Sequence, residues 1–164
     1  MPEVEITTDS LESLAIQFKR RLDEHAAAWS QALDNREAPA AFYSPSADII
    51  FIDPLPPFAG YHGWREFQQS LPPTVEHAEF RMHDGVKLVT SGDTAWTIAA
   101  FHLLLRFKNG QTVEGDARQT AVWQRQADGQ WLIVHLHESM PLPEETQPYQ
   151  ATADDLSKFR EATR

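Results

Sequence analysis

Apolar residues recur every three or four positions over the first part of the chain, and this spacing predicts one long amphipathic helix. Asp9 or Ser10 can cap its start, and the pattern continues to about Asn35. A short helical turn is expected over 38–43. The apolar positions of the long helix are Leu11, Leu14, Ile16, Phe18, Leu22, Ala26, Trp29 and Leu33. One face of this helix should therefore pack on a core.

After Pro73 the pattern changes to long stretches that alternate between apolar and polar residues, as strands do. Asn109-Gly110 is suited to a hairpin turn, because both residue types accept positive φ angles. A kink is expected at Asp84-Gly85. The long strands are expected over 75–89, 94–107, 112–125 and 130–139. Short strands over 47–53 and 58–61 precede them, followed by a short helix that opens at 63–67 and is stopped by Pro72-Pro73.

Helices followed by a long antiparallel meander predict an α+β fold. Strands of this length twist and curl, so we expect a cone-shaped, strongly curved antiparallel sheet with the N-terminal helices on its concave face. Such a concavity favours a small-molecule site. We expect an N-terminal tail over 1–8, a single domain over 9–142, and a C-terminal extension over 143–164 with a short helix over 153–162.

Composition narrows the classes of partner. A formal net charge of -10 argues against a nucleic-acid partner, which needs a basic surface. No apolar run reaches the length of a membrane span, and the acidic N-terminus lacks an apolar signal core, so we expect a cytoplasmic protein. The chain has no cysteine, which excludes disulfides, thiolate metal sites and cysteine nucleophiles.

The first expected strand runs through Ile49-Ile50-Phe51-Ile52 directly into Asp53 and Pro54. An unpaired carboxylate is costly to bury, so Asp53 is a candidate base in a pocket. The alternative is that Asp53 caps a surface turn before the proline.

Strand parity suggests partners for Asp53. In the last strand Leu132, Val134, Leu136 and Glu138 share the more apolar face, which we assign inward. In the strand over 94–107, His102 shares a face with Trp96, Ile98 and Ala100. The expected constellation is Asp53, His102 and Glu138, with Trp29 of the long helix as a wall. The opposite face carries Phe101, Leu103 and Leu105, which suggests a subunit interface on the outside of the sheet.

Simpler interpretations stay open. His102 can be a hydrogen-bonded core histidine, Glu138 a solvated residue at the rim, and Trp29 ordinary packing. His135 and His137 lie two apart on one strand and can bind one metal ion, although parity turns them away from the expected pocket. A histidine pair hydrogen-bonded within the sheet is the alternative.

Several segments resemble the nuclear transport factor two-like superfamily, which includes ketosteroid isomerase and the SnoaL-type polyketide cyclases. They are Gly92-Asp93-Thr94-Ala95, Thr120-Ala121-Val122-Trp123, Asp128-Gly129-Gln130-Trp131 and the run from Val134 to Ser139. They are most similar to the association domain of calcium/calmodulin-dependent protein kinase II. The resemblance implies a cystatin-like α+β roll.

The resemblance also implies site residues. Asp53-Pro54 matches the position of the general base in ketosteroid isomerase, and Trp29 falls where the isomerase has its tyrosine donor. The pocket glutamate of the kinase association domain falls on Asp53 as well. The arginines that face it there fall on His102, Ala121 and Glu138, so this chain lacks their positive lining.

These observations predict a protein with a small-molecule pocket that acts as an isomerase, cyclase or dehydratase. The alternatives are a non-catalytic ligand-binding or oligomerisation domain and, with less support, a metal-dependent enzyme; whether the chain is an enzyme stays open. We expect no cofactor, no bound metal, a small apolar or weakly polar ligand, and a homodimer formed through the outer sheet face. The expected catalytic residues are Asp53 and His102, and the expected ligand-binding residues are Trp29, Tyr43, Phe51, Trp64, Trp96, Arg118 and Glu138.

Overall fold

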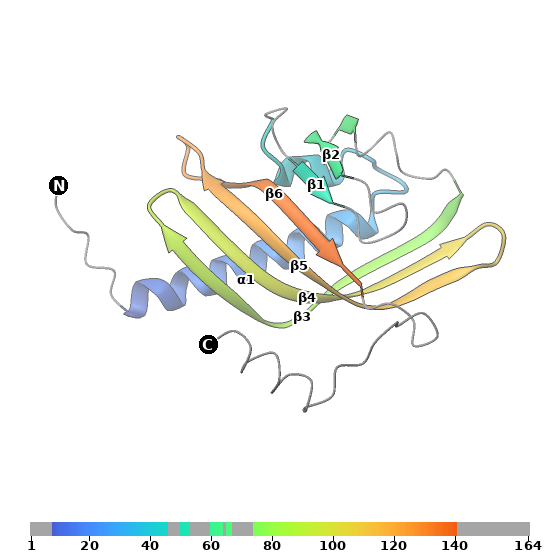
Figure 1. Ribbon diagram of the computed structural model, residues 1–164, viewed down its shortest axis with the longest axis horizontal. Helices are drawn as coiled ribbons and strands as arrows, with labels where there is room; N and C mark the ends of the chain where they lie inside the picture. Colours follow the sequence, from blue (N-terminus) through green and yellow to red (C-terminus); the bar gives the residue numbers. More distant parts are fainter. Residues whose placement is uncertain (1–7, 46–49, 53–59, 64, 67–73, 141–164) are drawn as a thin grey trace, which may run out of the picture.

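The computed structural model describes residues 8–45, 50–52, 60–63, 65–66 and 74–140 (Figure 1). The expected C-terminal helix, Asp53 and Trp64 lie outside these residues. Gly63, Arg65 and Glu66 are helical, as expected for the short helix that begins there. The elements are α1 (Thr8–Ser30), the 3-10 helix η1 (Ala38–Phe42), β1 (Ile50–Ile52), β2 (Gly60–His62), β3 (Val75–Ser91), β4 (Thr94–Phe107), β5 (Thr112–Arg125) and β6 (Trp131–Ser139).

The six strands form one sheet in the order β2-β1-β6-β5-β4-β3. Neighbouring strands are antiparallel except β1 and β6, which are parallel, with Ile52 beside His137. Figure 1 shows the long strands as a curved sheet with α1 lying across one face. We call that face of the sheet the inner face and the opposite one the outer face. The predicted α+β class is confirmed.

The inner face is held to α1 by aromatic and aliphatic side chains. Phe18 contacts the rings of Trp123 and Trp131 at centroid distances of 5.5 and 5.3 Å. At the end of the helix, the backbone N–H of Phe80 in β3 donates to Ser30 Oγ at 2.9 Å. The α-helix ends at Ser30, short of Asn35, and turns follow. Two apolar positions of the predicted stripe, Ile16 and Leu33, are exposed.

A β-bulge in β6 corrects part of the predicted strand parity. Trp123 pairs with Ile133 and Val122 pairs with His135, so Val134 is an extra residue without a cross-strand partner. Before the bulge, Trp131 and Ile133 are the buried residues, and the prediction that Leu132 and Val134 face inward is wrong. After the bulge, Leu136 lies on the inner face as predicted, since one extra residue reverses the alternation.

The faces of β4 are the reverse of those predicted. Phe101, Leu103 and Leu105 are buried and form an inner-face cluster with Ala117, so they are not an exposed interface. Trp96 and Ile98 are instead exposed on the outer face. Both faces of this strand are apolar in sequence, so its own alternation does not say which one is covered. Which face of β4 is covered depends on its pairing with the neighbouring strands.

The bend in β3 occurs at the predicted Asp84-Gly85. Met82 pairs with Phe101 and Val86 with Ala99, so three residues of β3 lie opposite one residue of β4. Gly85 has a φ of 85°, which a glycine adopts at no steric cost. The predicted turn at Asn109-Gly110 is also present.

Candidate functional site

Three polar side chains are buried among the described residues: His25, Thr97 and Gln119. Buried polar groups cost free energy unless they are hydrogen-bonded, so the hydrogen-bond partner of each of these side chains matters. Thr97 has a structural role, because its Oγ1 accepts a hydrogen bond from the indole N–H of Trp123 at 2.8 Å. His25 and Gln119 lie in a different setting.

His25 belongs to a buried hydrogen-bonded triad with Trp29 and Tyr43. The Tyr43 hydroxyl lies 2.9 Å from His25 Nε2, and Trp29 Nε1 lies 3.0 Å from His25 Nε2 and 3.3 Å from the Tyr43 hydroxyl. His25 and Trp29 are neighbours on α1 because they are four residues apart. Tyr43 follows η1 and is fixed by a β-bridge to Ile133 of β6. The triad therefore joins the helix to the inner face.

Burial fixes the protonation of the triad. Burial and, to a smaller extent, the positive charge of Arg21 together lower the pKa of His25 from 6.5 to about 3. His25 is therefore neutral near pH 7, and its Nε2 is an acceptor for the indole N–H of Trp29. Burial also raises the pKa of Tyr43, as does the nearby negative charge of Glu138, so Tyr43 keeps its proton.

Gln119 and Glu138 also lie on the inner face, and the charge of Glu138 acts on Tyr43 of the triad. They are cross-strand partners on β5 and β6, and Glu138 is half-buried. Gln119 is 3% exposed, and its Nε2 has no hydrogen-bond partner among the described residues. Cross-strand partners project on the same side of a sheet. We call His25, Trp29, Tyr43, Gln119 and Glu138 the inner polar site.

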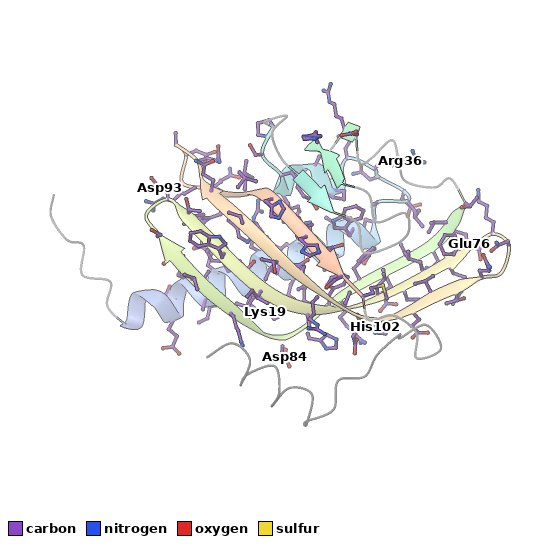
Figure 2. All side chains as sticks on the ribbon, in the orientation of Figure 1. Lys19, Arg36, Glu76, Asp84, Asp93 and His102 are labelled. Atoms are coloured by element: carbon purple, nitrogen blue, oxygen red, sulfur yellow. The ribbon has the colours of Figure 1, made fainter. Side chains whose placement is uncertain are left out.

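His102 lies on the opposite face of the sheet, near the middle of the long strands (Figure 2). Its Nδ1 lies 3.3 Å from Asp116 Oδ1 and its Nε2 lies 3.4 Å from Glu114 Oε1. His83 Nε2 also contacts Asp116, at 2.8 Å, and hydrogen bonds from the two histidines lower the pKa of Asp116. His102 and Glu138 therefore do not share a pocket, contrary to the expected constellation, because residue 102 has the outward parity of β4.

The other predicted site residues divide between the two faces. Trp29, Tyr43 and Glu138 come together in the inner polar site. Trp96 and Arg118 are exposed and occupy outward positions of β4 and β5. Asp53, Trp64 and the side chain of Phe51 lie outside the description. His25 and Gln119 were not predicted, although Gln119 alternates with Ala117 and Ala121 in a way that indicates an inward position.

A shallow groove of about 360 Å³ lies between α1 and the turn before β6. It is lined by charges of both signs, including Arg21 and Glu24, whose side chains lie 3.7 Å apart. Paired charges in an open groove have little tendency to bind a small molecule, so we place the candidate site at the inner polar site instead.

His135 and His137 of β6 pair across the sheet with Val122 and Thr120, outward positions of β5. In the part of the chain that the structure describes, no three histidine or carboxylate side chains are grouped to hold a metal ion. Within the same residues, no helix has the length and apolar character needed to span a membrane.

A curved sheet covered by one long helix, with polar residues on its inner face, defines a protein of the nuclear transport factor two-like class. A model of the SnoaL-like domain matches residues 23–143, and the chain belongs to that family. No curated protein sequence matches it significantly.

Solved structures of this class resemble the chain at low identity. A nuclear transport factor two-like protein from Salmonella enterica superposes with a TM-score of 0.71 at 17% identity, covering 85% of this chain and 99% of that one. A proposed dehydratase from Streptomyces avermitilis gives 0.64 at 20% identity over 81% and 99%. A proposed calcium/calmodulin-dependent protein kinase II association domain from Xanthomonas campestris gives 0.56 at 20% identity over 87% and 94%. At these identities the likeness shows the fold alone.

Proposed function

We propose that this SnoaL-like protein binds a small organic molecule at the inner polar site and acts on it as an isomerase, dehydratase or cyclase. The observation that carries the proposal is the buried triad of His25, Trp29 and Tyr43 beside the charge of Glu138. A domain stabilised only by packing would fill this position with apolar side chains, since these leave no hydrogen bonds to satisfy. The dehydratase name given to a structural neighbour is compatible with this chemistry.

Asp53 is the proposed general base. Asp53 directly follows Ile52 in the sequence, and the Asp53-Pro54 pair matches the position of the general base in ketosteroid isomerase. In the proposed reaction, Asp53 removes a proton from the carbon next to a carbonyl group, and the enolate formed then takes up a proton elsewhere or expels a hydroxyl group.

The test is proton exchange in D₂O, followed by NMR with a panel of β-hydroxy ketones and β,γ-unsaturated ketones. Asp53→Asn should lower the enzyme-dependent rate by about 10²-fold or more, since it removes the base. Asp128→Asn is the matched control, because Asp128 lies in an exposed turn and asparagine can still accept the hydrogen bond from the Gln130 N–H. Equal rates for Asp53→Asn and the wild type would reject the role of Asp53.

A second candidate function is assembly through the outer face. Val89, Trp96 and Ile98 are exposed apolar side chains, and Val89 and Trp96 are cross-strand partners. Contiguous exposed apolar surface is typical of an interface. The proposed association domain among the structural neighbours makes a second copy of the chain the natural partner, so we propose a homodimer with this face at its centre.

A further inference from the structure

We infer that the side-chain amide of Gln119 donates a hydrogen bond to the carbonyl oxygen of an uncharged ligand, an inference that rests on the proposed function. It concerns one atom, Gln119 Nε2, which is closed to solvent and has no acceptor in the part of the chain that the structure describes. Two other buried side-chain donors, the indole N–H groups of Trp29 and Trp123, both have acceptors. Gln119 Nε2 differs from them in this respect.

The surroundings of Gln119 indicate that the amide is not needed to hold the fold. Its neighbours on the inner face are small: Ala117 and Ala121 two residues away on β5, and Ala99 across on β4. A methionine or leucine at position 119 would extend the apolar core at no hydrogen-bonding cost. The chain instead carries an amide donor for which the described residues supply no acceptor, which is what a site for a hydrogen-bond acceptor requires.

The charges of the inner polar site select the class of ligand. Glu138 is the cross-strand partner of Gln119, and its negative charge is strong enough at this position to act on Tyr43. His25 is neutral, and the five residues of the inner polar site include no cation. Arg21, whose charge acts on His25, lies outside the site and 3.7 Å from the carboxylate of Glu24. A carboxylate or phosphate would be repelled by Glu138, whereas a ketone, ester or amide presents an oxygen acceptor without a net charge.

The probe is 2-cyclohexenone, with cyclohexanecarboxylate as the anionic control of similar size. The ¹⁵N-labelled protein is titrated with each, and the side-chain NH₂ resonances of Gln119 are assigned by their loss in Gln119→Met. We expect 2-cyclohexenone to shift these resonances downfield in a saturable way and cyclohexanecarboxylate to leave them unchanged. The Trp29 indole resonance reports on binding at the inner polar site independently of Gln119.

Substitution separates a ligand contact from a structural role. Gln119→Met should raise the midpoint of thermal unfolding of the ligand-free protein and weaken 2-cyclohexenone binding by about fivefold to tenfold, the loss of one hydrogen bond. Gln124→Met is the control, because Gln124 is exposed on the same strand. It should change neither quantity.

Three results would overturn the inference. If 2-cyclohexenone shifts the Trp29 indole but not the Gln119 amide, the proposed site stands and the role of Gln119 fails. If neither signal responds to either probe, the inference fails together with the proposed binding site. If Gln119→Met lowers the unfolding temperature, the amide is a structural group. If Gln119→Met is unstable, triple-resonance experiments on the wild type assign the Gln119 amide, and the wild-type titration then decides the matter alone.

Discussion

The surroundings of His25 strongly change its acid–base behaviour. Its ordinary pKa of 6.5 falls to about 3 because the imidazole is buried and because the positive charge of Arg21 is close. Below pH 6.5 the unfolded chain binds a proton at this residue and the folded protein does not. The contribution of His25 to stability is therefore complete above pH 6.5 and is lost as the pH falls from there toward 3.

Replacing His25 by glutamine should remove this pH dependence. Between pH 6.5 and 5 the wild type should lose about 2 kcal/mol of unfolding free energy through His25, at about 1.4 kcal/mol per pH unit. His25→Gln should lack this loss, although it should be less stable at pH 7, since its amide only partly replaces the imidazole. Urea unfolding at the two pH values measures the difference. His77→Gln, at an exposed histidine, should keep the wild-type dependence, and equal slopes for all three proteins would contradict the prediction.

At this scale the sequence predicts part of the site. Trp29, Tyr43 and Glu138 are predicted and lie together. Trp29 follows the helical pattern and Glu138 the strand alternation, whereas no pattern distinguishes Tyr43. His102 is misplaced, since the choice between the two apolar faces of β4 depends on neighbouring strands. His25 is missed because a histidine in an amphipathic helix has no distinguishing spacing of its own. Its role comes from Tyr43, a contact 18 residues away.

The long strands are the elements that the sequence predicts best. The boundaries of β4 and β5 agree with the expected ranges, because glycine-containing turns end them and their alternation is regular. The bulge in β6 is not predictable from alternation, since Trp131 to Ser139 has apolar residues at both parities. The parallel pairing of β1 with β6 is likewise a long-range contact that neither short segment encodes alone.

The bend in β3 gives a prediction at this scale. An alanine at Gly85 meets no neighbouring atom, but it must adopt a φ of 85°, which costs about 1–2 kcal/mol. Gly115→Ala is the control, because its Cβ would lie 3.4 Å from the flexible end of Met140 and needs no unusual φ. Urea unfolding should show Gly85→Ala destabilised by about 1 kcal/mol or more and Gly115→Ala within about 0.5 kcal/mol of the wild type. Equal effects would mean that the bend does not depend on the glycine.

For the molecule as a whole, the outer face of the sheet is the proposed surface of homodimer assembly. The sequence predicts that this face is an interface but assigns it the wrong residues, and the structure exposes Val89, Trp96 and Ile98 there instead. A stable dimer buries at least about 1,000 Å² in total, so these side chains would form the centre of a larger contact. With a formal net charge of -10, two copies also repel each other, and added salt should favour association.

Ile98→Glu should convert the proposed dimer to a monomer, because it places a charge at the centre of the apolar surface. Ile16→Glu is the matched control: it introduces the same charge at an apolar residue of α1 that is 67% exposed and outside the proposed interface. Sedimentation velocity over a hundredfold range of concentration at 0.5 M salt should give a dimer for the wild type and for Ile16→Glu. A wild-type protein that is monomeric throughout would contradict the proposed assembly.

The extra residue at Val134 has a consequence for comparing related sequences. It allows one strand to direct Trp131 and Ile133 inward at one end and Leu136 inward at the other. A homologue that lost this residue would turn one half of the strand over, unless polar and apolar residues in that half were exchanged at the same time. Deletions here should therefore be accompanied by several linked substitutions. An ungapped alignment through the strand would equate the buried positions of one protein with the exposed positions of another.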